Sequence, residues 1–137
     1  MVVTLLIAAS GHIAAQAEPV TVQARLVLGT SKEQKDQMEV SAGIKRKLAQ
    51  VFKWKHYYEV NSKQMNIADT ATKSAKLSRA AQIKVTNRKN GRVAVTLFSK
   101  GKMLVQKNQS LKPGSHMVLA GNSAFDSAWF IVLTKSK

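Results

Sequence analysis

The chain has 137 residues, no cysteine, and 22 Lys and Arg against 7 Asp and Glu, which gives a net charge of +15. The lack of cysteine excludes disulfides and structural zinc sites of the thiolate type, and so few carboxylates leave little material for acid–base catalysis. The charge favours polyanionic partners, because a strongly basic protein attracts anionic surfaces whatever its fold.

The first seventeen residues have the pattern of a secretory signal peptide. An apolar stretch, Val2 to Ala9, precedes the small-residue cleavage site Ala15-Gln16-Ala17. The apolar run is shorter than the roughly eighteen residues that a membrane-spanning helix needs. We therefore expect residues 1–17 to be removed and residues 18–137 to form a single β-rich domain. The mature chain is then periplasmic or secreted and has no transmembrane anchor.

A strand followed by a helix is predicted for the start of the mature chain. Residues 20–28 alternate between apolar and polar side chains, as in a half-buried strand, and the polar segment 29–40 is expected to be a loop. Ser41 can cap a helix. Its buried stripe is formed by apolar residues that recur at helical spacing, namely Ile44, Leu48, Val51 and Phe52.

The period changes to two after Lys53, in a run rich in aromatic residues that favour strands. Trp54 and Tyr58 lie on one face of this predicted strand, and we expect them to pack in the core. Lys55 and Tyr57 lie on the other face, so they are the pair expected to be exposed.

Short strands separated by turns are predicted for the second half of the chain. Weak strand candidates lie at 65–67 and 75–77. Clear alternation over 81–85, 93–97 and 103–105, with turns at 87–91, 99–101 and 113–114, predicts a meander. The apolar runs 117–120 and 128–133 predict strands buried on both faces. The predicted fold is mainly β (α+β): an antiparallel meander of about seven or eight strands, as a sandwich or a partly open barrel, with one helix in the N-terminal half.

Three groups of residues carry a resemblance to known proteins. They are the opening strand that ends at 26–28, the helix that leads into the aromatic strand over 48–58, and the C-terminal apolar segments 118–121 and 131–133. In this order they resemble an uncharacterised family of exported β-rich domains of Gram-negative bacteria, which has no assigned activity. The resemblance spans most of residues 22–134 and consists mainly of core positions, so it implies the fold and no chemistry.

No catalytic or metal site is predicted. His56 and His116 are the histidines of the mature chain, and Glu59 points away from His56 on an alternating strand. A triad can be written from Ser115 or Ser123 with His116 and Asp126, but no nucleophile elbow supports it. We therefore expect a protein that is not an enzyme and uses no cofactor.

Basic and aromatic side chains interleave densely over residues 45–58. The candidate binding residues are the cations and the aromatic expected at the surface, Lys45, Arg46, Lys53, Lys55 and Tyr57. Such a segment can stack on bases or sugar rings, or it can place its aromatic residues in the core and its lysines in solvent. Elsewhere the charge is expected to be dispersed, because successive hairpin tips of a meander lie at opposite ends of the sheet.

The predicted function is a non-enzymatic binding or assembly module of the bacterial cell envelope with weak, salt-dependent affinity for polyanions. Its partner would be an anionic glycan or lipid of the envelope, or another envelope protein. The alternative is a single-stranded nucleic-acid-binding β-barrel that uses residues 45–58 as its platform.

Overall fold

The computed structural model describes residues 19–136. The predicted signal peptide, residues 1–17, lies outside the described residues. In chain order the elements are β1 (Val20–Thr30), β2 (Met38–Glu39), α2 (Ala42–Ala49), β3 (His56–Ile67), β4 (Thr72–Lys76), β5 (Ala81–Asn87), β6 (Arg92–Ser99), β7 (Lys102–Ser110), β8 (His116–Ser123) and β9 (Ser127–Lys135).

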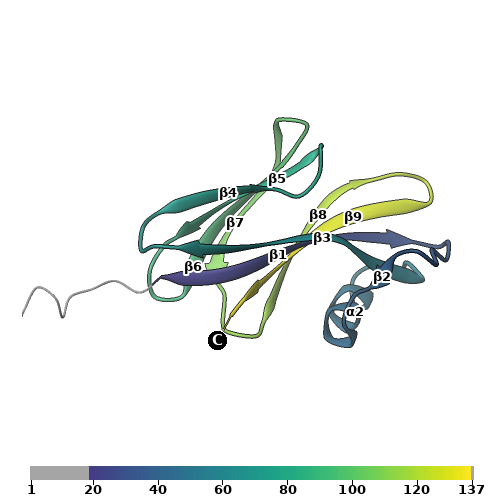
Figure 1. The fold of residues 1–137 in the computed structure, drawn as a ribbon, viewed down its shortest axis with the longest axis horizontal. Coiled ribbons are helices and arrows are strands. Elements are labelled where there is room, and N and C mark those ends of the chain that lie inside the picture. The colour runs from purple at the N-terminus through teal and green to yellow at the C-terminus, as the bar shows by residue number, and fades with distance from the viewer. Residues whose placement is uncertain (1–18, 137) are drawn as a thin grey trace, which may run out of the picture.

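The strands form two antiparallel sheets that pack face to face (Figure 1). Sheet A has the order β2-β3-β1-β9-β8, and sheet B has the order β4-β5-β6-β7. The mainly β prediction is confirmed, and of its two forms the chain adopts the sandwich. Only sheet B is a simple meander. In sheet A, β1 lies between β3 and β9, so strands distant in sequence are neighbours.

A bulge in β3 lets this strand contribute to two cores. The register between β1 and β3 shifts between Leu26 and Val27, which leaves Val60 as an extra residue in β3. One extra residue reverses the faces to which odd- and even-numbered side chains point. Tyr57 therefore packs toward α2, whereas Met65 packs between the two sheets.

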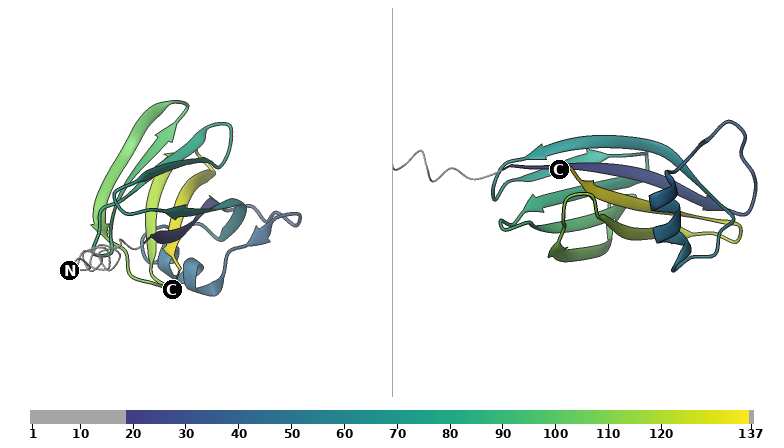
Figure 2. Two further views of the ribbon diagram at one scale, coloured as in Figure 1. Left: turned by 60° about the vertical axis from the view of Figure 1, so that its left-hand side comes forward. Right: turned by 90° about the horizontal axis from the view of Figure 1, so that it is seen from below.

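Sheet A contributes buried residues on both of its faces. One face packs against sheet B, and the other is covered by α2, as Figure 2 shows. β9 contributes to both cores, with Ile131 and Leu133 between the sheets and Phe130 and Val132 toward the helix. The prediction that 128–133 is buried on both faces is confirmed.

The same prediction for residues 117–120 is wrong in part. β8 is an edge strand of sheet A, and Ala120 at its centre is exposed.

The predicted loop 29–40 contains a short strand, β2, which pairs with β3. The weak strand candidates 65–67 and 75–77 coincide with the ends of β3 and β4.

The helix begins as predicted and ends earlier than predicted. The Ser41 side chain accepts a hydrogen bond from the Ile44 N–H at 3.4 Å, and Ile44 and Leu48 are buried against sheet A. Helix α2 ends at Ala49, so Val51 leaves the buried stripe and is exposed. Phe52 still reaches the core, where its ring centroid lies 4.5 Å from that of Phe130.

The central position of β9 gives a stability prediction. Ile131 is completely buried between the sheets, so Ile131→Ala should lower the free energy of unfolding by about 2–5 kcal/mol. The exposed Val51 serves as the aliphatic control, and Val51→Ala should change it by less than about 0.5 kcal/mol. Chemical denaturation measures both, and equal midpoints for the two variants would contradict the assigned place of β9.

Candidate functional site

Four of the five predicted binding residues are exposed. Lys45 and Arg46 lie on α2, and Lys53 and Lys55 lie on the segment that leads from α2 into β3. Helix α2 covers the face of sheet A that points away from sheet B. These cations therefore form a basic surface on the helix side of the sandwich.

The prediction that Tyr57 is exposed is wrong. Only 1% of its surface is exposed, its ring centroid lies 6.2 Å from that of Phe130, and its hydroxyl accepts a hydrogen bond from the Trp54 N–H at 3.3 Å. Burial raises the pKa of the Tyr57 hydroxyl. The face of β3 that alternation assigned to solvent is the face that α2 covers.

The other aromatic residues of the segment also serve the core. Phe52 and Trp54 are half-buried against the cluster that contains Tyr57. Tyr58 is buried, as predicted, and its hydroxyl accepts a hydrogen bond from the Gln34 N–H at 2.8 Å. Residues 45–58 therefore present cations without an accompanying aromatic platform.

Sheet B carries ten cations, twice the five of residues 45–58, and like that segment it contains no carboxylate. No Asp or Glu occurs between Asp69 and Asp126, so the whole of sheet B lacks carboxylates. The strands and turns of the sheet carry ten cations: Lys73, Lys76, Arg79, Lys84, Arg88, Lys89, Arg92, Lys100, Lys102 and Lys107.

The outer face of sheet B is built from rows of side chains that lie opposite one another across the four strands. Ile83, Val85, Val95 and Leu97 point into the core, so the residues between them point outward. One outward row is Lys76, Gln82, Phe98 and Met103, and the next is Ser74, Lys84, Thr96 and Gln106. The Nζ atom of Lys84 lies 5.6 Å from the centroid of the Phe98 ring, a cation–π contact between these rows.

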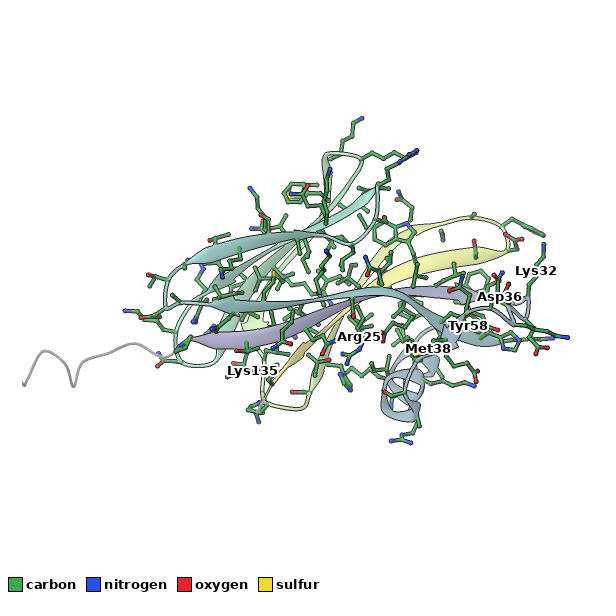
Figure 3. The ribbon with its side chains drawn as sticks, in the orientation of Figure 1. Arg25, Lys32, Asp36, Met38, Tyr58 and Lys135 are labelled. Atoms are coloured by element: carbon green, nitrogen blue, oxygen red, sulfur yellow. The ribbon has the colours of Figure 1, made fainter. Side chains whose placement is uncertain are left out.

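Two turns meet at one end of sheet B. The β4–β5 turn and the β6–β7 turn are joined by a 2.9 Å hydrogen bond from the Lys100 N–H to the Ala80 carbonyl, and both lie at the top of Figure 1. Side chains that end in nitrogen project from this end in Figure 3. We call this end the basic tip. Its cations are Lys76, Arg79, Lys100 and Lys102.

Apolar side chains are exposed within the basic tip. Met103 is 60% exposed, and Leu104, the extra residue at a second bulge between β6 and β7, is 39% exposed. Phe98 lies opposite Met103 and is half-buried. As predicted from the meander, the tip is separate from the β5–β6 turn with Arg88. The contribution of Arg79 was not anticipated, because β4 was not recognised as a full strand.

A polar hollow of about 720 Å³ lies at the opposite end of the sandwich. The backbone of Thr70, Lys89 and Asn90, at its rim or beside it, has positive φ, which is unusual for side chains other than glycine. Asn87 holds this region together: its side chain donates to the Ile67 carbonyl at 3.2 Å and accepts from the Lys89 N–H at 3.1 Å. Asp69 is the carboxylate in the lining, and it lies 3.7 Å from the Lys89 amine.

A second groove of about 450 Å³ runs between α2, β7 and β8. Lys107, which points inward from the edge strand β7, donates a 2.8 Å hydrogen bond to the Val118 carbonyl on the edge of β8. Inward lysines on edge strands hinder pairing with other chains. His116 also lines the groove, and its Nδ1 lies 2.8 Å from the Thr134 hydroxyl.

Within residues 19–136, no three His, Cys, Asp or Glu side chains are grouped closely enough to hold a metal ion. Over the same residues, no helix is sufficiently long and apolar to cross a bilayer.

The burial of Tyr57 predicts a structural role. Tyr57→Ala should lower the free energy of unfolding by about 3–5 kcal/mol, because it removes a ring packed against Phe130. Lys55→Ala, at an exposed neighbouring position, should stay within about 0.5 kcal/mol of the wild type. A Tyr57→Ala protein with an unchanged denaturation midpoint would show that Tyr57 is not part of the core.

His116 predicts a pH dependence of stability. Burial lowers its pKa below the usual 6.5, and the charges of Arg25 and Lys47 lower it further. The unfolded chain therefore binds a proton more readily, so this contribution to stability is full above about pH 6.5 and is lost as the pH falls toward the lowered folded-state pKa.

Denaturation of the wild type and of His116→Asn between about pH 8 and pH 5 measures this contribution. Asparagine keeps an acceptor for the Thr134 hydroxyl and does not titrate, while all carboxylates are common to both proteins. The wild type should lose more stability than the variant over this range. Identical losses would mean that His116 is not desolvated in the folded chain.

Comparison with known proteins found no family model, no curated protein and no solved structure that matches the chain.

Proposed function

We propose that this chain is a non-enzymatic binding module of the bacterial cell envelope, periplasmic or secreted, that binds polyanions through sheet B. The observation that carries the proposal is the distribution of charge on this sheet, whose strands and turns contain ten cations and no Asp or Glu; of the ten, Lys89 pairs with Asp69, which precedes the sheet. The signal-peptide pattern of residues 1–17 supports the exported location.

The composition of sheet B favours binding without sequence preference. Seven of its ten cations are lysines, which act as hydrated point charges and lack the planar fork with which arginine recognises phosphate in two places. Affinity should therefore arise mainly from counterion release and decrease as salt increases. The partner class is an anionic glycan or lipid of the envelope.

The nucleic-acid alternative loses its main support. It required an aromatic platform over residues 45–58, and Tyr57, its only predicted exposed ring, is buried. Nucleic acid is then one polyanion among others. The exposed cations Lys45, Arg46, Lys53 and Lys55 add to the positive field from the helix side of the molecule.

Charge reversal on two surfaces tests the proposal. Lys76→Glu/Lys84→Glu changes the outer face of sheet B, and Lys45→Glu/Arg46→Glu changes α2 by the same net charge. Affinity for heparin should fall at least about tenfold further in the sheet B variant, and wild-type affinity should fall steeply with salt for both heparin and single-stranded DNA.

Denaturation midpoints of both double variants provide the control for folding, since all four side chains are exposed. Equal losses from the two surfaces would show that only net charge matters. A heparin affinity that does not change with salt would contradict a polyanion site made of lysines.

A further inference from the structure

We propose that the basic tip docks on an anionic lipid bilayer, with its cations at the headgroup phosphates and Met103 and Leu104 in the apolar layer beneath. This inference rests on the proposed function, and it names one class of polyanion, a lipid surface.

The exposed apolar side chains of the basic tip, Met103 and Leu104, have no role in binding a soluble polyanion. A glycan or nucleic acid in solution can neutralise the lysines of sheet B, but it offers no apolar layer for Met103 or Leu104. A bilayer interface offers both an anionic surface and acyl chains within reach of a hairpin tip. Exposed apolar residues in the same tip as four cations therefore match a membrane surface better than they match a soluble chain.

The geometry of the tip suits a surface contact. The two turns project beyond the rest of the sandwich (Figure 1), and the Lys100–Ala80 backbone bond fixes them beside each other. Lys76 lies at the far end of the row that contains Phe98 and Met103, and Lys102 precedes Met103 on β7, so the same end of the sheet carries both cations and apolar residues. Lysine stems can cover apolar surface while the amines stay at the headgroup level.

The charge of the tip supplies the attraction. It has four cations, and the stretch between Asp69 and Asp126 contributes no carboxylate to oppose them. Near an anionic leaflet, each Lys or Arg raises partition by about fivefold, and the attraction falls off within a Debye length. Charge draws the tip to the surface, and apolar insertion then makes binding less sensitive to salt than glycan binding is.

Two of the other exposed apolar residues lie beside carboxylates, which is a different electrostatic setting. Met38, 65% exposed on β2, lies opposite Glu59 and next to Glu39, and it is far from the two turns in Figure 3. Phe125 is fully exposed in the β8–β9 turn, but it precedes Asp126, which pairs with Lys32 at 3.3 Å. An anionic membrane would repel the carboxylates beside these residues.

Vesicle co-sedimentation tests the docking site. The probes are vesicles of phosphatidylcholine alone and of an equimolar mixture with phosphatidylglycerol, and heparin is the soluble polyanion. The wild type should bind the anionic vesicles and not the neutral ones. Met103→Gln/Leu104→Gln should lower partition onto anionic vesicles by about tenfold and leave heparin affinity unchanged.

Met38→Gln is the matched control, because it removes an equally exposed methionine from the other sheet. It should change neither vesicle nor heparin binding. Phe125→Gln should also leave vesicle binding unchanged. If Met103→Gln/Leu104→Gln binds anionic vesicles as well as the wild type, or if Phe125→Gln loses binding instead, the basic tip is not the docking site.

A fluorescent reporter measures insertion directly. The chain has no cysteine, so Met103→Cys and Met38→Cys can each carry a single environment-sensitive dye. Anionic vesicles should shift the emission of the Met103→Cys conjugate to the blue and leave that of Met38→Cys unchanged. Heparin binding without this shift would overturn the docking inference and leave the proposed function intact. Binding to neither probe would overturn both.

Discussion

Val60 lies in β3 at a register shift with β1, and this extra residue lets one strand supply two cores. Before the bulge, Tyr57 points toward α2, and after it, Met65 points toward sheet B. Sheet A can therefore be covered on both faces, by a helix and by a second sheet. Because sheet B covers one face of sheet A and α2 covers part of the other, the outer face of sheet B is a broad β surface that the described residues leave open.

The two sheets differ in how their charges are compensated. On sheet A and its loops, carboxylates pair with cations: Arg25 with Glu59 at 3.0 Å and Lys32 with Asp126 at 3.3 Å. Among the described residues, Lys89 is the cation of sheet B with a carboxylate within ion-pair distance. Exposed ion pairs contribute little to stability, so their absence from sheet B costs little. The consequence is a persistent positive field on one side of the molecule.

Local patterns predicted the strands and the helix start well, because they depend on neighbouring residues. The alternation around Ile83 and Val95 predicted buried faces, the apolar run around Ile131 predicted a buried strand, and Ser41 predicted a helix cap. Alternation shows that the two faces of a strand differ in polarity, but it does not show whether another element covers the more polar face. That is why Tyr57 was assigned to solvent when α2 in fact lies over it.

The candidate site was harder to predict, because it depends on pairing across strands. The sequence Thr72–Lys76 has no apolar alternation, so only the end of β4 was predicted, as a weak candidate at 75–77. The contact between Lys100 and the β4–β5 turn, which contains Arg79, therefore could not be predicted. One signal was available in the sequence, namely the absence of any Asp or Glu between Asp69 and Asp126. It indicates that all charged side chains of sheet B are positive. The predicted binding residues were instead those of the denser basic and aromatic cluster at 45–58, on the helix side of the molecule.

The most direct test of polyanion binding through sheet B is chemical-shift mapping of backbone amides by NMR. A heparin-derived oligosaccharide is added to the isotope-labelled chain. If polyanions bind through sheet B, the largest shifts fall on β4 to β7, above all around Lys76, Lys84 and Lys100, and α2 changes little. Shifts concentrated on residues 45–58, with sheet B unchanged, would contradict binding through sheet B.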